Sequence, residues 1–203
     1  MIAVGYYGPW IAHPTAALTL TGVDMGEFVK FLPQVLDRTL QVTRFLFYLP
    51  PLTAVVSVAI FALSPRLEYP WPLRLVAYVL AVLMSLQLLP PAWSPSSLLT
   101  AEFRLQTIAL LAGWLLLASS RLWSQRSTWF VALLSGLLSL AAGGLSTWQF
   151  WLVKPAIDLV YGRPPSAGWG FFLCIAGLMA SALASFVAQS FISGQPRKFQ
   201  SQR

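Results

Sequence analysis

The sequence has few charged side chains. Asp, Glu, Lys and Arg make up 9% of its 203 residues, whereas hydrophobic residues make up 57%. Ordinary soluble domains carry about 25% charged residues, which keep their surface hydrated. The composition therefore excludes an ordinary water-soluble domain and predicts a protein whose surface is largely covered by lipid.

Cysteine and histidine are almost absent as well. Cys174 and His13 are the only residues of their types. One cysteine excludes a disulfide within the chain, and one cysteine with one histidine excludes a Cys/His metal site built by this chain alone. We therefore predict no metal site, no catalytic residue is assigned, and no cofactor is predicted from this chain alone.

The basic residues form no dense cluster, although the formal net charge is +7. The 13 Lys and Arg residues are scattered between apolar stretches. Binding to a nucleic-acid backbone would need a basic stripe or patch. The predicted partners are the lipid bilayer and other membrane protein subunits, with no nucleic acid.

Five long apolar stretches are present instead. A helix needs about 20 mainly apolar residues to cross a hydrocarbon core of roughly 30 Å. The sequence thus predicts an all-α fold, a polytopic transmembrane helical bundle of about five spans within 45–192, followed by a polar basic tail at 193–203. The predicted spans are about 45–63, 75–93, 105–120, 128–153 and 169–192.

Orientation is predicted from the connecting segments, because cytoplasmic loops are enriched in Lys and Arg. The set of alternate segments that includes the C-terminal tail carries seven such residues, and the opposite set carries six. The tail and the 121–126 loop contain no acidic residue. We expect an integral protein of the cell (inner) membrane with a cytoplasmic C-terminus.

Residues 1–44 are predicted to form an N-terminal interfacial segment with short amphipathic helices. The apolar opening is too short to cross a bilayer. Either it dips into the interface, anchored by Tyr6, Tyr7 and Trp10, or it is the end of a first span, which would give six spans. Further along, Asp24 and Glu27 have the spacing of an N-terminal helix cap, with Asp24 as the capping residue.

The fifth predicted span carries small residues at regular intervals. They form two adjacent rows, so one side of the helix is expected to pack closely against another helix. Leu178 is offset from this side. The neighbour belongs either to this chain or to another. The helix-packing face comprises Ala176, Ala180, Ala184 and Ala188 in one row, and Gly177, Ser181 and Ser185 in the other.

The predicted spans contain no ionisable residue, which argues against ion-coupled or catalytic chemistry inside the membrane. Lys154 and Asp158 follow the fourth span at a helical spacing that suits an ion pair. The favoured hypothesis is a non-catalytic membrane subunit, a scaffold or accessory component of a larger complex. The alternatives are a small transporter, channel or permease component for a neutral or lipid-like substrate and, less favoured, a headgroup-level enzyme using His13, Asp24 and Glu27.

Overall fold

The computed structural model describes residues 1–15, 18–63, 69–89, 94, 96–123, 128–162 and 164–193. Most of these residues are helical, so the predicted all-α class is confirmed. The helices are α1 (Ile2–Tyr7), α2 (Gly22–Phe28), α3 (Pro33–Leu36), α4 (Leu49–Leu63), α5 (Trp71–Ser85), α6 (Arg104–Trp123), α7 (Thr128–Tyr161) and α8 (Trp169–Ser193). The 3-10 segments are η2 (Val29–Phe31), η3 (Arg44–Tyr48), η4 (Leu86–Leu88) and η5 (Ser97–Leu99), and the strands are β1 (Pro9–Ala12), β2 (Leu20–Thr21) and β3 (Ser166–Ala167).

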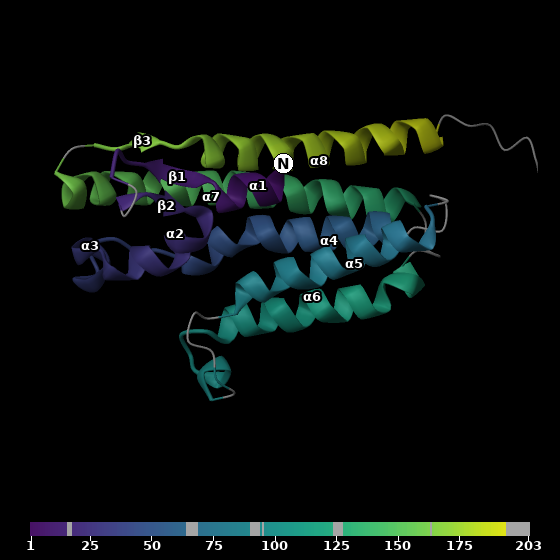
Figure 1. Cartoon of the computed structure of the whole chain (residues 1–203), viewed down its shortest axis with the longest axis horizontal. Coiled ribbons are helices and arrows are strands. Elements are labelled where there is room, and N and C mark those ends of the chain that lie inside the picture. The colour runs from purple at the N-terminus through teal and green to yellow at the C-terminus, as the bar shows by residue number, and fades with distance from the viewer. Residues whose placement is uncertain are drawn as a thin grey trace, which may run out of the picture.

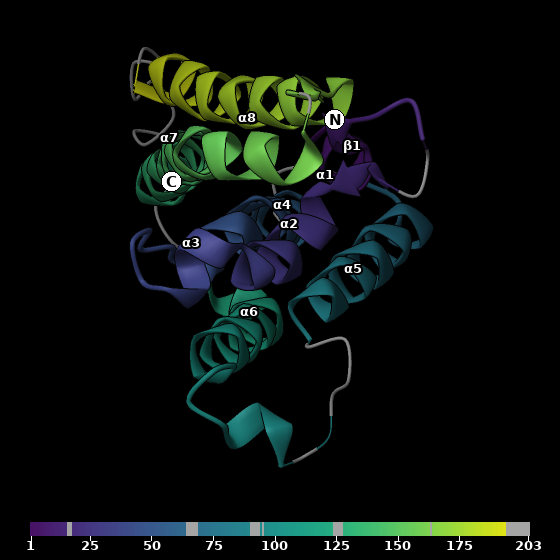
Figure 2. The same ribbon diagram turned by 90° about the vertical axis from the view of Figure 1, so that its left-hand side faces the viewer.

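The five longest helices lie side by side as an elongated bundle (Figure 1). Helix α4 contacts α5, α6 and α7, and α7 also packs along α8. Figure 2 shows α8 over α7, with α4 beneath them and with α5 and α6 on the far side. Helix α4 therefore joins an α7–α8 pair to an α5–α6 pair.

Two helices of the described residues are long and apolar enough to cross a membrane. They cover Phe130–Tyr161 in α7 and Trp169–Val187 in α8. The other apolar helices are shorter, at Arg44–Ile60, Trp71–Ser85 and Arg104–Ser119. The expectation of about five spans is therefore corrected to two helices that meet this requirement.

The shorter helices have identifiable starts and ends. Pro50 and Pro51 stand in the first turn of α4, where missing N–H groups cost little, and the preceding residues form the 3-10 segment η3. Helix α5 has 15 residues and ends at η4. Fifteen residues of α-helix extend about 22 Å, less than the roughly 30 Å of a hydrocarbon core.

A small three-stranded sheet, which the sequence analysis did not predict, holds the N-terminal residues against the α7–α8 connection. Strand β1 lies between β2 and β3 and pairs antiparallel with both. The amide of Gly168 also donates to the carbonyl of Trp10 at 2.9 Å. The sheet thus joins the N-terminal segment to the α7–α8 connection.

Trp10 is at the centre of the main core. Its indole is fully buried and its Nε1 donates to the carbonyl of Gly5 at 3.2 Å. The rings of Phe47, Phe150 and Phe171 surround it, with centroids 5.4–6.2 Å away. Tyr6 is also buried, so two of the three residues expected to anchor the segment in the membrane interface lie inside the protein instead.

Candidate functional site

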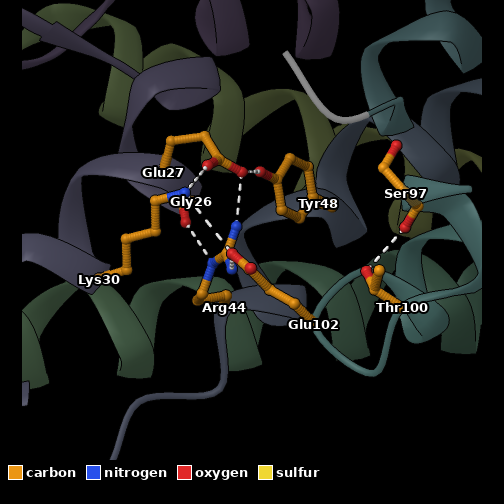
Figure 3. A network of polar contacts seen from close by, with 8 residues as sticks. All are labelled: Gly26, Glu27, Lys30, Arg44, Tyr48, Ser97, Thr100 and Glu102. Atoms are coloured by element: carbon orange, nitrogen blue, oxygen red, sulfur yellow. Dashed lines mark hydrogen bonds and ion pairs between the residues drawn. The ribbon is translucent and has the colours of Figure 1, made fainter. Parts of the chain in front are cut away.

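Arg44 occupies the centre of an ionic cluster where α2, η3 and the start of α6 meet (Figure 3). Its Nη2 lies 2.6 Å from Oε1 of Glu27, and its Nη1 lies 2.7 Å from Oε1 of Glu102. Its Nε donates to the carbonyl of Gly26 at 2.8 Å. One guanidinium therefore connects three segments that are far apart in the sequence.

Lys30 and Tyr48 complete the cluster around Glu27 (Figure 3). The Nζ of Lys30 lies 2.8 Å from Oε2 of Glu27, and the hydroxyl of Tyr48 donates to Oε1 of Glu27 at 3.0 Å. Two carboxylates face two cations, so the cluster carries no net charge.

Gly26 gives this cluster its compactness. A Cβ atom at this position would lie 2.6 Å from the Oη atom of Tyr48, closer than carbon and oxygen can approach without bonding. The absence of a side chain thus lets Tyr48 lie against α2 and reach Glu27. Glu27 directly follows Gly26 in the sequence, so its carboxylate lies beside the space that the missing side chain of Gly26 leaves open.

The pKa of Glu27 reflects two opposing effects. Burial favours the neutral acid and would raise the pKa of its carboxyl group, but the hydrogen bond from Lys30 and the charge of Arg44 outweigh burial. The result is a pKa below the ordinary glutamate value. Glu27 is therefore held in its charged form as a structural anion, and not as a proton donor near neutral pH.

A cavity of about 260 Å³ opens beside the cluster. Gln106 lies at this cavity with 4% of its surface exposed, and its Nε2 has no hydrogen-bond partner within the described residues. The walls of the cavity combine apolar side chains with the charged groups of Arg44 and Glu102, and the Nε2 of Gln106 is buried. Its lining residues are Val42, Thr43, Arg44, Phe45, Glu102, Leu105 and Gln106.

The structure separates the two small-residue rows on α8. Gly177 is buried against α1, where a Cβ atom would lie 2.7 Å from the amide nitrogen of Ile2. The hydroxyl of Ser139 on α7 donates to the hydroxyl oxygen of Ser181 at 3.2 Å, and Ser185 is buried. The row that begins at Gly177 thus has neighbours within this chain.

The alanine row points elsewhere. Ala176, Ala180 and Ala184 are exposed, and the side chain of Ala188 lies outside the described residues. Leu178, which was expected to be offset from the packing side, is fully buried and packs close to Gly143 of α7. That expectation is corrected: Leu178 belongs to the packed side because it is four residues from Cys174 and seven from Ser185, which are also buried.

The predicted cap residues serve two different purposes. The N-cap of α2 is Thr21, whose hydroxyl accepts from the Asp24 amide while the Asp24 carboxylate accepts from the Thr21 amide at 2.9 Å. The box therefore begins three residues earlier than expected, and Asp24 is its N3 residue. Glu27 instead belongs to the ionic cluster.

Removing the capping hydroxyl should destabilise α2. We expect Thr21→Val to lower the free energy of unfolding by about 0.5–2 kcal/mol, because the hydroxyl satisfies an amide at the helix start. Thr21→Ser keeps the hydroxyl and serves as the control. Thermal unfolding of the purified protein in detergent measures both variants, and equal stability of the two would contradict the capping role.

The residues considered for headgroup-level chemistry are each engaged separately. The Nδ1 of His13 accepts from the Thr15 amide at 3.1 Å, and its ring packs edge-on against Tyr161. Asp24 is bound within the cap and Glu27 within the ionic cluster. The described residues contain no group of three or more His, Cys, Asp or Glu side chains that could hold a metal ion.

Lys154 and Asp158 form the ion pair that their spacing predicts, with 2.6 Å between Nζ and Oδ1. The sequence analysis missed Glu102 and the role of Arg44, although both flank apolar stretches. It also missed Ala81 and Ser85, two small residues of α5 that are buried against neighbouring helices. Their spacing of about one turn was a readable signal.

Comparisons of this chain with protein-family models, with curated proteins and with solved structures gave no match.

Proposed function

We propose that this chain is a non-catalytic integral membrane subunit, a scaffold or accessory component of a larger membrane complex. The observation that carries the proposal is the alanine row on α8. Ala176, Ala180 and Ala184 are exposed at intervals of four residues on a helix that meets the length and apolarity of a span. In lipid, small residues at this spacing let a second helix approach closely, and close packing drives association.

The outer surface of the bundle supports the membrane part of the proposal. On α5 the side opposite the buried Ala81 exposes about half of each of Val76, Val79 and Leu83. Large apolar side chains are similarly exposed on α6, α7 and α8. Contiguous apolar surface of this extent marks contact with lipid or with another protein.

The charged groups support the non-catalytic part. The cations of Lys30, Arg44 and Lys154 each have a carboxylate partner within the chain. A cation whose charge is neutralised by a carboxylate of the same chain is poorly placed to activate a substrate. We further propose that the C-terminus lies in the cytoplasm, as the Lys and Arg distribution predicts.

The proposal predicts that a larger side chain in the alanine row weakens association with the partner subunit. Ala180→Leu should weaken association with the co-purifying membrane subunits by roughly 5- to 160-fold, which corresponds to the about 1–3 kcal/mol typical of overpacking. The fold should be retained, because Ala180 is exposed in the isolated chain. The measurement is affinity purification from membranes in mild detergent, with quantitative mass spectrometry of the partners and a melting temperature for the chain.

Ala141→Leu is the matched control, since Ala141 is an exposed alanine on α7 outside the row. Unchanged partner recovery in Ala180→Leu would reject the alanine row as the contact. A chain that purifies alone, with no stoichiometric partner, would reject the subunit function itself.

A second candidate is a small transporter, channel or permease component for a neutral or lipid-like substrate. The observation that favours it is the cavity of about 260 Å³ beside Arg44, in whose wall apolar side chains lie next to polar ones. Uptake of neutral solutes by liposomes that contain the purified chain alone distinguishes this function from that of a non-catalytic subunit.

A further inference from the structure

We propose that α4, α7 and α8 enclose ordered water molecules in a seam of buried hydroxyl groups inside the bundle. The principal site lies between Ser57 of α4 and Ser135 of α7. This inference concerns the interior of the chain and does not depend on the subunit function.

The seam is defined by six hydroxyl-bearing residues of low exposure. Ser139 and Ser185 have direct partners, because their hydroxyls lie 2.9 Å from the carbonyls of Ser135 and Ser181 respectively. The hydroxyls of Thr53, Ser57 and Ser135 have no partner within the described residues, although these residues are 0%, 8% and 2% exposed. Three donors thus lack acceptors in the same part of the core.

The side of α4 that carries two of these hydroxyls turns toward α7. Val55 and Ala59 pack with residues of α5 and α6. Thr53 and Ser57 each lie two residues from Val55, which corresponds to about 200° around a helix. They are therefore on the opposite side of α4, toward the α7–α8 pair that α4 also contacts.

The register of α4 and α7 sets Ser57 and Ser135 at one level. The two helices run in opposite directions (Figure 1), and the hydroxyl of Ser146 donates to the carbonyl of Leu46 at 2.9 Å. Ser57 is 11 residues beyond Leu46, and Ser135 is 11 residues before Ser146 (57 − 46 = 146 − 135). The first steps on the α4 side lie in the 3-10 segment η3, which rises about 0.5 Å more per residue than an α-helix, so the two serines come to within about one residue's rise of the same height.

The third helix extends the seam at the same two levels. Helix α8 runs antiparallel to α7, and Ser139 lies 3.2 Å from the hydroxyl of Ser181. One turn further, Ser185 is level with Ser135. Ser57, Ser135 and Ser185 therefore form one layer, and Thr53, Ser139 and Ser181 form the next.

Because the hydroxyl groups of these two layers are buried, water is the ligand that suits them best. An unpartnered buried hydroxyl costs about 1–3 kcal/mol, so three of them in one seam would be a heavy penalty in a helical bundle. Water both donates and accepts, and buried water typically makes about three hydrogen bonds to such groups. The seam offers several hydroxyls from three helices and no charged side chain, which suits water better than an ion.

The test is a double-variant cycle on Ser57 and Ser135, measured as melting temperatures of the full chain in detergent. Ser57→Ala and Ser135→Ala should each lower the melting temperature by about 2–4 °C, the shift expected for one lost hydrogen bond in a chain of this size. If both serines bind the same water, the double variant should melt no more than slightly below the worse single variant.

Ser146→Ala is the control, because the Ser146 hydroxyl bonds directly to Leu46 and should add independently to Ser57→Ala. Single variants that are as stable as the parent, or more stable, would show that the hydroxyls are dry and would overturn the proposal. Single variants that destabilise additively would show separate bonds to the carbonyls of their own helices, which overturns it as well.

Discussion

Placing a methyl group at Gly5 is expected to destabilise the fold by about 3 kcal/mol, at the upper end of the usual cost of overpacking. Gly5 lies where α1 crosses α8. A Cβ atom there would lie 2.7 Å from the Cα of Cys174 and 2.8 Å from the carbonyl oxygen of Gly170. Both neighbours are backbone atoms of a long helix, so they cannot rotate away as a side chain would.

The consequence of Gly5→Ala extends beyond one contact. If α1 is displaced from α8, Trp10 loses the carbonyl of Gly5 to which its indole donates. Strand β1 follows α1 directly, so its pairing with β2 and β3 should loosen too. We expect a lower melting temperature and increased proteolytic cleavage within residues 1–44, measured by thermal unfolding and limited proteolysis in detergent.

Gly144→Ala is the matched control. Gly144 also lies in a helix, but nothing would lie within 4 Å of an added Cβ atom. That substitution should stabilise the protein by about 0.5–1 kcal/mol, because alanine loses less conformational freedom in a helix than glycine. Similar melting temperatures for Gly5→Ala and Gly144→Ala would contradict the close approach of α1 and α8.

The sequence predicted the helical class because its apolar stretches are long and interrupted by clear breakers. It did not predict how many of these stretches form helices that are long enough to cross a membrane. The apolar stretch at 75–93 extends beyond α5, which ends at Ser85, whereas α7 continues past the predicted end of its span through Pro155 to Tyr161. Hydropathy records composition, but the length of a helix depends on local backbone geometry.

The N-terminal segment shows a different limit of sequence analysis. Trp10 and Tyr6 are typical of a membrane-interface anchor, yet both are buried, and Trp10 contacts Phe150 and Phe171, which are more than 100 positions away in the sequence. The four-residue period on α8 was readable, but which row meets α7 depends on helix rotation. Tertiary contacts set that rotation, and small residues on both sides do not reveal it.

Arg44 is the residue whose loss should most disturb the ionic cluster. We expect Arg44→Gln to lower the free energy of unfolding by about 2–3 kcal/mol at neutral pH, because the partly buried carboxylate of Glu27 loses one of its two cationic partners. Arg44 and Glu27 have only 19% and 20% of their side chains exposed, whereas Glu102 is 49% exposed. The pairing with Glu102 should therefore contribute much less than the pairing with Glu27.

The loss of stability in Arg44→Gln should depend on pH, and the pKa of Glu27 sets the direction of this dependence. The folded-state pKa of Glu27 is lowered, so its ionisation stabilises the fold above its unfolded-state pKa of about 4.3, and this stabilisation is lost as the pH falls through the lower folded-state value. In Arg44→Gln the charge of Arg44 no longer lowers the pKa of Glu27, whereas burial still raises it. Protonation of Glu27 then removes a partly buried charge that has kept only Lys30 as a cationic partner.

The stability difference between the parent chain and Arg44→Gln should therefore be largest near pH 7. It should shrink as the pH falls below the unfolded-state pKa of about 4.3 and through the lower folded-state value, where Glu27 becomes protonated in both. Melting temperatures across this range measure the difference. Arg38→Gln is the matched control, since Arg38 is exposed and outside the cluster, and its effect should be small at every pH. A difference for Arg44→Gln that stays constant from pH 7 to pH 3 would show that Arg44 stabilises the fold by packing alone, without holding Glu27 in its charged form.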